Sequence, residues 1–216
     1  MVENGECLLL LQSVPQLREA INLTQKLDLF IRKCQLCHFI YDSKTLATPN
    51  ILVASNRKLE ELTDILEYLH HRDDILTSET VPYIIKMVAI NIFHARPAFD
   101  STIDYEEDEV VHPDWPSLKL VFGIFLRVCA SQKVDAGLLK KHITSSFIIQ
   151  FLELFKGEDQ NCRDYLKTIL HSIYARCMSL RCFIRKSMHH VIYSFVYDEY
   201  NPYHPGISEV LEIQGK

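Results

Sequence analysis

The sequence predicts an all-α fold, a HEAT-like helical-repeat solenoid in which helix pairs stack into an α-α superhelix. Three observations support this class. Apolar residues recur at helical spacing in several segments, such segments follow one another in pairs across short polar turns, and no series of strand-like segments competes with them. The pairs recur at uneven intervals of roughly 40–60 residues, which suits the loosely patterned HEAT class. Stacked repeats of this kind typically build extended binding surfaces.

The N-terminal part of the chain is the least regular. Residues 1–24 show weak periodicity and are predicted to be a poorly defined segment, whereas 25–216 are predicted to form a single solenoid domain. A first helix is expected at about 27–41, and a polar connector that contains Pro49 is expected at 43–56. The regular repeats are expected to begin at the end of this connector.

The clearest helix pair comes next. Ser55 or Asn56 is a suitable N-cap for a helix that ends near residue 71. A second helix is expected at about 79–95, with Pro82 in its first turn, where the missing amide of proline does no harm. The apolar residues of the first helix keep helical spacing at Leu59, Leu62, Ile65, Leu66 and Leu69. The two helices are therefore predicted to form one hairpin.

An aperiodic stretch then separates this hairpin from the rest of the chain. It carries the acidic run from Asp104 to Glu109 and predicts a solvated loop at about 98–114, with a docking surface as the alternative. A strongly apolar helix is expected to begin at Trp115 and Pro116. The helices expected after the loop are 115–129, 136–142, 146–155, 161–178 and 180–200, with a tight turn around Ser179 between the last two.

Composition excludes several functional classes. The 216-residue chain has 48% apolar residues and a formal net charge of −5, so it has enough material for a core but no basic excess for nucleic acid. No run approaches the roughly 18 apolar residues of a membrane span, and the N-terminus lacks the features of a secretory signal. Seven cysteines scattered through helical segments suit reduced thiols. We therefore expect a soluble protein of the cytoplasm and/or nucleus.

One short motif suggests a cofactor, but its context opposes it. Cys34-Gln35-Leu36-Cys37-His38 matches the haem-attachment pattern, yet it lies in an apolar helical segment of a chain without an export signal. Zinc would need two further ligands, and no second Cys-x2-Cys or His-x3-His pair occurs. We expect packed cysteines, no cofactor and no metal site. A thiol or metal-dependent enzyme is the minor alternative.

The most informative chemistry lies at residues 163–186, where six cations face a single acid, Asp164. The cations are Arg163, Lys167, Arg176, Arg181, Arg185 and Lys186. Lys167, His171 and Tyr174 share one helix face, beside the stripe predicted to be buried. Because guanidinium groups match carboxylate and phosphate, this surface is predicted to bind an extended peptide with acidic or phosphorylated residues. The alternative is a solvated basic helix face.

Three long segments resemble the B-prime (B56) family of regulatory subunits of protein phosphatase 2A. They are LTDILEYLHHRDDILTSETVPYIIKMVAINIF at 62–93, EEDEVVHPDWPSLKLVFGIFLR at 106–127 and FIIQFLELFKGEDQNCRDYLKTILHSIYARCMSLRCFIRK at 147–186. The resemblance extends over about residues 25–214. It implies a HEAT-like solenoid, of which this chain matches about the N-terminal half.

The resemblance also implies a function. Family members are non-catalytic targeting subunits that bind the scaffold and catalytic subunits of the phosphatase and recruit substrate proteins through short acidic motifs of the Leu-x-x-Ile-x-Glu type. The chain is accordingly expected to be a regulator without catalytic residues. Carried over by position, the peptide groove of the family falls on Lys167, Thr168, His171, Tyr174, Arg181, Arg185, Glu212 and Ile213.

Two departures from the family pattern bear on this function. Ser172 stands where the family generally has an arginine after the groove histidine, which removes one expected guanidinium. The chain also ends at Lys216, whereas family members continue through several more repeats, so the solenoid is predicted to be truncated at its C-terminal end. Leu211 and Ile213 are then expected on an exposed apolar end. A truncated peptide-binding decoy, or a remnant unable to join the holoenzyme, is the alternative function.

Overall fold

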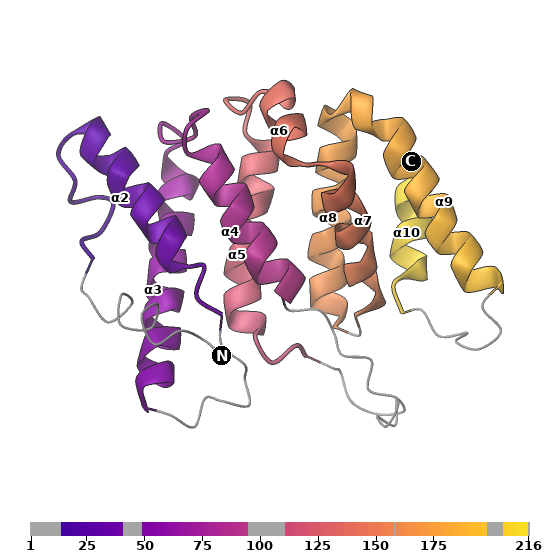
Figure 1. Ribbon diagram of the computed structural model, residues 1–216, viewed down its shortest axis with the longest axis horizontal. Helices are drawn as coiled ribbons and strands as arrows, with labels where there is room; N and C mark the ends of the chain where they lie inside the picture. Colours follow the sequence, from indigo (N-terminus) through magenta and orange to yellow (C-terminus); the bar gives the residue numbers. More distant parts are fainter. Residues whose placement is uncertain (1–13, 41–48, 95–110, 158, 198–204, 216) are drawn as a thin grey trace. The chain divides into compact units, whose positions relative to one another are not determined.

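The computed structural model describes residues 14–40, 49–94, 111–157, 159–197 and 205–215. Within these residues the chain forms nine α-helices and no strand, which confirms the predicted all-α, helical-repeat class (Figure 1). The chain divides into two compact units. The first unit comprises Met1–His94 and Pro116–Asp135, and the second comprises Ala95–Trp115 and Ala136–Lys216. The prediction of one domain over 25–216 stays a prediction.

In the residues that the structure describes, the first unit has four α-helices. They are α2 (Leu23–Leu36), α3 (Pro49–His71), α4 (Val81–His94) and α5 (Trp115–Ala130), of which α5 belongs to this unit from Pro116 onward. The helix α2 packs against both α3 and α4. The apolar stripe predicted on α3 is real, because Leu62, Ile65 and Leu69 are buried.

Helix α5 approaches α3 closely at Gly123. A Cβ atom at this position would lie 3.2 Å from Cδ2 of Leu66, so a larger residue would force the leucine to move. Near the end of α5, Arg127 donates through Nη2 to the carbonyl oxygen of Leu69 at 2.9 Å. This bond satisfies one of the carbonyls that the last turn of α3 leaves without a helical partner.

A buried ion cluster holds the start of the first unit together. Lys33 on α2 is 1% exposed and pairs with Glu61 and Asp64 on α3, the latter at 3.1 Å. Asp64 also accepts a hydrogen bond from the backbone amide of Leu17 at 3.0 Å. One lysine and one aspartate therefore connect α2, α3 and the segment that precedes α2.

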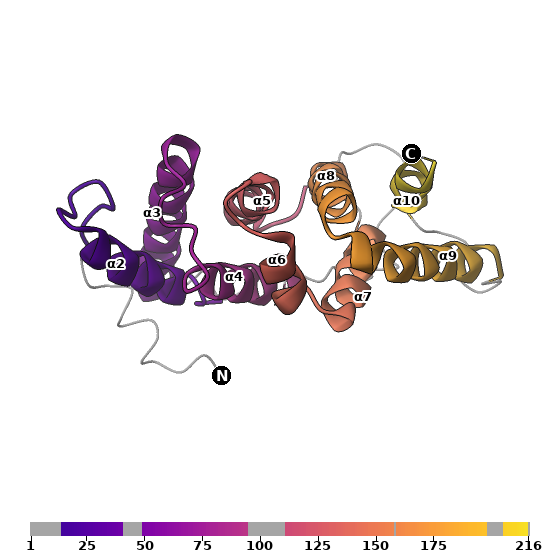
Figure 2. The same cartoon turned by 90° about the horizontal axis from the view of Figure 1, so that it is seen from above.

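The described part of the second unit contains five α-helices and two short 3-10 turns. Its α-helices are α6 (Ala136–His142), α7 (Ser145–Glu153), α8 (Gln160–Arg176), α9 (Arg181–Tyr197) and α10 (Ile207–Gln214). The 3-10 turns are Leu154–Lys156 and Met178–Leu180. The helix α10 packs against both α8 and α9, as Figures 1 and 2 show, and α7 packs against α9.

Side-chain caps mark the starts of two helices in this unit. The hydroxyl of Thr144 accepts a hydrogen bond from the amide of Phe147 at 3.2 Å and begins α7. The carboxylate of Asp159 accepts from the amides of Asn161 and Cys162 at 2.8 and 3.3 Å and begins α8. Both are the oxygen-bearing side chains that helix N-termini favour, because their oxygens satisfy amides that lack a helical partner.

The structure corrects two predicted boundaries in the first unit. The helix expected at 27–41 lies instead at Leu23–Leu36, four residues earlier at its start and five at its end. The helix expected from Ser55 already begins at Pro49, and Ser55 is a buried residue inside it, not a cap. Proline is well suited to a first helical position because it needs no amide partner there. Residues 43–48 of the predicted connector lie outside the described residues.

Most later boundaries agree with prediction to within two residues. The exception is the helix expected at 180–200, for which α9 reaches Tyr197. The helix expected at 146–155 is α7, followed directly by a 3-10 turn. The acidic run of the predicted loop at 104–109 lies outside the described residues, as do 198–200. Among the described helices, none combines the length and apolarity that a membrane span requires.

Candidate functional site: the α8–α10 pocket

Two helices of the second unit meet at a shallow pocket of about 220 Å³, which we call the α8–α10 pocket. Its lining consists of residues that the sequence assigns to the peptide groove, namely Lys167, Thr168 and His171 from α8 and Glu212 and Ile213 from α10. Thr168 and His171 are exposed, whereas Ile213 is only 5% exposed. The pocket therefore has an apolar floor from α10 beside a polar rim from both helices.

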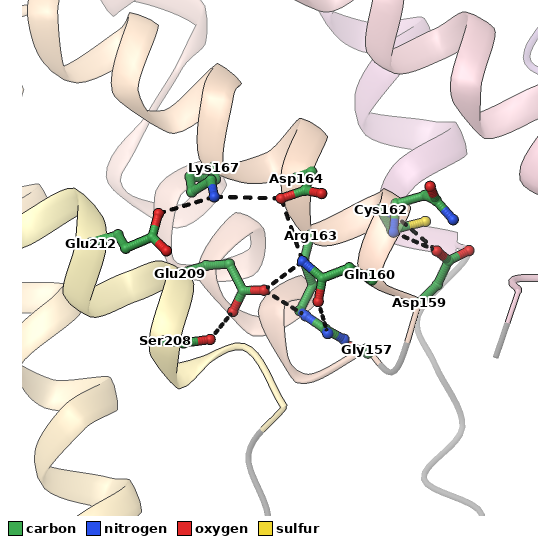
Figure 3. Close-up of polar contacts among 11 residues, drawn as sticks. Gly157, Asp159, Gln160, Cys162, Arg163, Asp164, Lys167, Ser208, Glu209 and Glu212 are labelled. Carbon is green, nitrogen blue, oxygen red and sulfur yellow. Dashed lines mark hydrogen bonds and ion pairs between the residues drawn. The ribbon is translucent and has the colours of Figure 1, made fainter. Parts of the chain in front are cut away.

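A buried ion pair holds α10 in place beside α8 (Figure 3). The guanidinium of Arg163 donates from Nε to Oε1 of Glu209 at 3.0 Å, and the two side chains are 9% and 4% exposed. Oε1 of Glu209 also accepts from Gln160 at 3.1 Å, and Oε2 accepts from Ser208 at 2.8 Å. Both carboxylate oxygens thus have partners, as a buried charge requires.

The remaining donors of Arg163 are also used. Nη1 donates to the carbonyl oxygen of Gly157 at 2.8 Å, and Nη2 donates to Oε1 of Gln160. Arg163 is 8% exposed, which corrects its assignment to a basic surface. The physical reason is that α10 covers this turn of α8 and supplies the carboxylate that makes burial of the guanidinium tolerable.

Lys167 lies one turn further along α8 and is paired with two carboxylates of its own chain (Figure 3). Its ammonium is 3.0 Å from Oε2 of Glu212 and 3.4 Å from Oδ1 of Asp164. The hydrogen bond with Glu212 is the main reason that the pKa of Lys167 is raised above its ordinary value. The lysine is therefore firmly protonated and already neutralised when no ligand is present.

The predicted groove residues beyond the pocket have separate roles in the structure. Arg181 donates from Nε to the carbonyl oxygen of Tyr174 and from Nη2 to that of Ala175, both at 2.8 Å. Its guanidinium carbon also lies 5.2 Å from the centre of the Tyr174 ring. Arg181 thus completes the C-terminal end of α8 and positions Tyr174.

Of the three cations in the predicted groove, Arg185 is the one that remains available to a ligand. It is exposed on α9 and makes no side-chain ion pair or hydrogen bond with other described residues. Of the eight predicted groove residues, the structure brings five into the α8–α10 pocket and leaves Tyr174, Arg181 and Arg185 outside its lining. Ser172, which replaces the arginine expected from the family, is half-buried on α8.

Sequence reasoning missed the residues that support the pocket. Asp164 lies three residues before Lys167, so that pair has a local signal in the helix spacing. Glu209 has no such signal, because it is 46 residues from Arg163 in the chain. The predicted exposed end is also only half right, since Leu211 is 50% exposed but Ile213 is buried in the pocket floor.

The haem-like motif lies in a packed region of the first unit. Cys34 and Cys37 are both fully buried, and burial is the main cause that raises the pKa of Cys37 to about 12. The pKa of Cys34 is raised for the same reason, whereas burial lowers the pKa of His38. Both thiols are therefore held in the protonated form. Among the described residues, no group of three or more His, Cys, Asp or Glu side chains is placed to hold a metal ion.

Comparison with known proteins places the chain in a family. The family profile described as protein phosphatase 2A regulatory B subunit (B56 family) matches residues 14–216. The B' alpha isoform of the 57 kDa phosphatase 2A regulatory subunit of Arabidopsis thaliana is 35% identical over 212 residues, which cover 94% of this chain and 42% of the relative. The alpha isoform of the human 56 kDa regulatory subunit is 34% identical over 95% of this chain and 42% of the relative.

A further relative shows the same pattern of coverage. The delta isoform of the human 56 kDa regulatory subunit is 34% identical over 95% of this chain but only 34% of its own length. The chain thus spans between a third and under half of the length of these curated relatives. The match extends over nearly all described helices of both units. The chain belongs to the B56 family of protein phosphatase 2A regulatory B subunits.

Proposed function

We propose that this chain is a non-catalytic regulatory subunit of protein phosphatase 2A that recruits substrate proteins through acidic or phosphorylated peptides. The relatives are named regulatory subunits of this phosphatase, which supports the regulatory role. The observation that carries the recruitment role is the convergence of five predicted groove residues on the α8–α10 pocket. The peptides expected to bind there have the Leu-x-x-Ile-x-Glu pattern.

The chemistry of the pocket suits such a peptide. Ile213, which is 5% exposed, offers a small apolar contact at the pocket lining for an aliphatic side chain, because burying apolar area against it removes that area from water. The exposed His171 and Thr168 supply hydrogen-bonding groups at the rim. Arg185 on α9 adds a guanidinium that has no partner among the described residues and is suited to a carboxylate or phosphate.

Peptide binding is tested by titrating a fluorescent Leu-x-x-Ile-x-Glu peptide with the full chain. Arg185→Glu is expected to weaken binding by about ten-fold or more, because it replaces an attraction by a repulsion of similar size. Lys186→Glu is the matched control, since Lys186 is the next residue of α9, is also exposed and undergoes the same charge change. Equal losses in the two variants would indicate a general charge effect and count against a specific site.

Assembly is tested by co-purification with the phosphatase scaffold and catalytic subunits. Recovery of both supports the role as a regulatory subunit. Peptide binding without recovery of either supports the peptide-binding decoy, which keeps the pocket but does not join the holoenzyme. If the chain captures neither the peptide nor the other two proteins, the proposed function is wrong and only family membership remains.

A further inference from the structure

We propose that Glu212 is a resident competitor for Lys167, so that it selects which acidic peptides the α8–α10 pocket accepts. The proposal rests on the function proposed above and concerns the specificity of the same pocket. Its basis is the ion pair between the Glu212 carboxylate and the Lys167 ammonium, 3.0 Å apart. A ligand acid that uses Lys167 must therefore replace a carboxylate that is already bound.

Position distinguishes Glu212 from the other carboxylate on this lysine. Glu212 lines the α8–α10 pocket, whereas Asp164 lies on the N-terminal side of Lys167 and is not among the lining residues. Asp164 is also more distant, at 3.4 Å against 3.0 Å. A ligand in the pocket consequently meets Glu212 first, and the lysine keeps Asp164 as a second partner after the exchange.

The exchange is physically feasible because only a side chain has to move. Glu212 is 58% exposed, so water can solvate its carboxylate once it leaves the lysine. The backbone of α10 is held separately by the buried pair of Glu209 with Arg163, one turn earlier on each helix. The pocket can thus release Glu212 without loosening α10.

The displaced carboxylate has a consequence for specificity. Lys167 carries one positive charge and its two partners carry two negative charges, so this corner of the pocket has a local net charge of −1. A peptide acid without a neighbouring cation is repelled by the freed Glu212. A peptide with a cation beside its acid can place the acid on Lys167 and the cation on Glu212. We therefore infer that Glu212 favours peptides with adjacent acid and base over purely acidic ones.

The expected effect is modest because the pair is exposed. An exposed ion pair contributes little free energy. Losing its competition should therefore change the dissociation constant of the peptide by roughly two- to five-fold. The effect should shrink as salt rises, because salt screens the attraction between solvent-exposed charges.

The test uses the full chain and a fluorescent acidic peptide, with a second peptide in which the acid is replaced by glutamine. Glu212→Gln is expected to increase the affinity for the acidic peptide by about two- to five-fold and to leave the affinity for the glutamine peptide unchanged. Glu153→Gln is the matched control, because Glu153 is an exposed glutamate paired with Lys156 at 2.7 Å on a different helix. This control is expected to change neither affinity.

A double-mutant cycle tests whether Glu212 acts through the lysine. In a Lys167→Gln background, the gain from Glu212→Gln should disappear, because no cation remains for which the two acids compete. A third peptide with a lysine beside its acid should gain less from Glu212→Gln than the purely acidic peptide. Thermal unfolding of each variant checks that the fold is retained.

The outcomes separate this inference from the function on which it rests. If the wild-type chain binds the acidic peptide and Glu212→Gln leaves its affinity unchanged or lowers it, Glu212 is not a competitor and the inference is overturned. If the gain persists in the Lys167→Gln background, it reflects general charge and the inference is likewise overturned. If no variant binds any of the peptides, the proposed function fails, and the inference fails with it.

Discussion

Two ion pairs join α8 to α10, one turn apart on each helix, and they differ in burial. Arg163 and Glu209 are 9% and 4% exposed at the side chain, whereas Lys167 and Glu212 are 30% and 58% exposed. The atoms of both pairs are 3.0 Å apart. Distance therefore does not distinguish the two ion pairs. They differ in whether water can replace a partner that has been removed.

Water replaces a lost partner of the exposed pair but not of the buried one. Without Glu209, the Arg163 guanidinium would lose the carboxylate that α10 supplies and would remain charged in a water-poor interface. Without Glu212, the Lys167 ammonium keeps Asp164 and gains solvent. We infer that the buried pair fixes the position of α10, and that the exposed pair is free to exchange with a ligand.

The largest effect is expected in the first unit, which has a buried cation of its own. Lys33→Ala would leave Glu61 and Asp64 without their shared lysine, so unfolding should become easier by about 3–5 kcal/mol. Urea unfolding followed by circular dichroism measures this change. Arg18→Ala removes the exposed pair with Glu67 and is the matched control, with an expected loss below about 1 kcal/mol. Similar losses in both variants would contradict the importance of burial.

The corresponding change in the second unit should be nearly as large. Glu209→Ala removes the acid that pairs with the buried Arg163, with an expected loss near the lower end of about 3–5 kcal/mol. The same urea titration measures it. Because α10 carries Glu212 and Ile213, peptide affinity should fall as well, even where the protein remains folded. A stability loss with unchanged peptide affinity would show that α10 does not need this anchor.

Acid should weaken the buried pair of Arg163 with Glu209 once Glu209 becomes protonated. Burial by itself would raise the pKa of Glu209, but hydrogen bonds from three neighbouring side chains outweigh it and hold the pKa below its ordinary value. A depressed folded-state pKa stabilises the protein above the unfolded pKa, near 4.3 for glutamate, and this contribution is lost as pH falls through the folded value. Unfolding free energies from about pH 6 to about pH 3 should therefore fall more steeply for wild type than for Glu209→Gln.

The smallest effect is expected for the exposed pair. Lys167→Gln should change the free energy of unfolding by about 0.2–1 kcal/mol, and salt should reduce even this difference. Thermal unfolding at low and high salt measures both quantities. A loss as large as that of Glu209→Ala would mean that Lys167 is part of the scaffold and would remove the basis for an exchangeable pair.

Much of the fold was predictable because helix formation depends on neighbours a few residues away. The apolar spacing of α3, α4 and α5 located these helices, and the proline near the start of α4 agreed with its position. The prediction failed at the start of α3, because Pro49 and the residues after it have no strong periodic pattern, yet they extend the helix. Pro49, Asn50, Leu52 and Val53 are exposed, so no buried stripe marks this end in the sequence.

The candidate site was predictable in its position but not in its electrostatics. Helical spacing placed Lys167 and His171 on one face of α8, and the family resemblance added Glu212 and Ile213, all of which meet in one pocket. The predicted set of six cations was wrong as a surface, because Arg163 is buried and Arg181 is bonded to backbone carbonyls. A count of charges in the chain does not reveal which of them are already paired.

The sequence by itself determined the helices, their buried stripes and the family to which the chain belongs, since these depend on residue types and on spacing within a segment. Only the tertiary structure decided that Arg163 supports α10 and that Lys167 is held by Glu212. The physical reason is that the partners of these cations come from a helix more than 40 residues later, Glu209 being 46 residues from Arg163 and Glu212 being 45 from Lys167. The contact of α10 with α8 decides which charges are buried, and burial decides which of them remain available to a ligand.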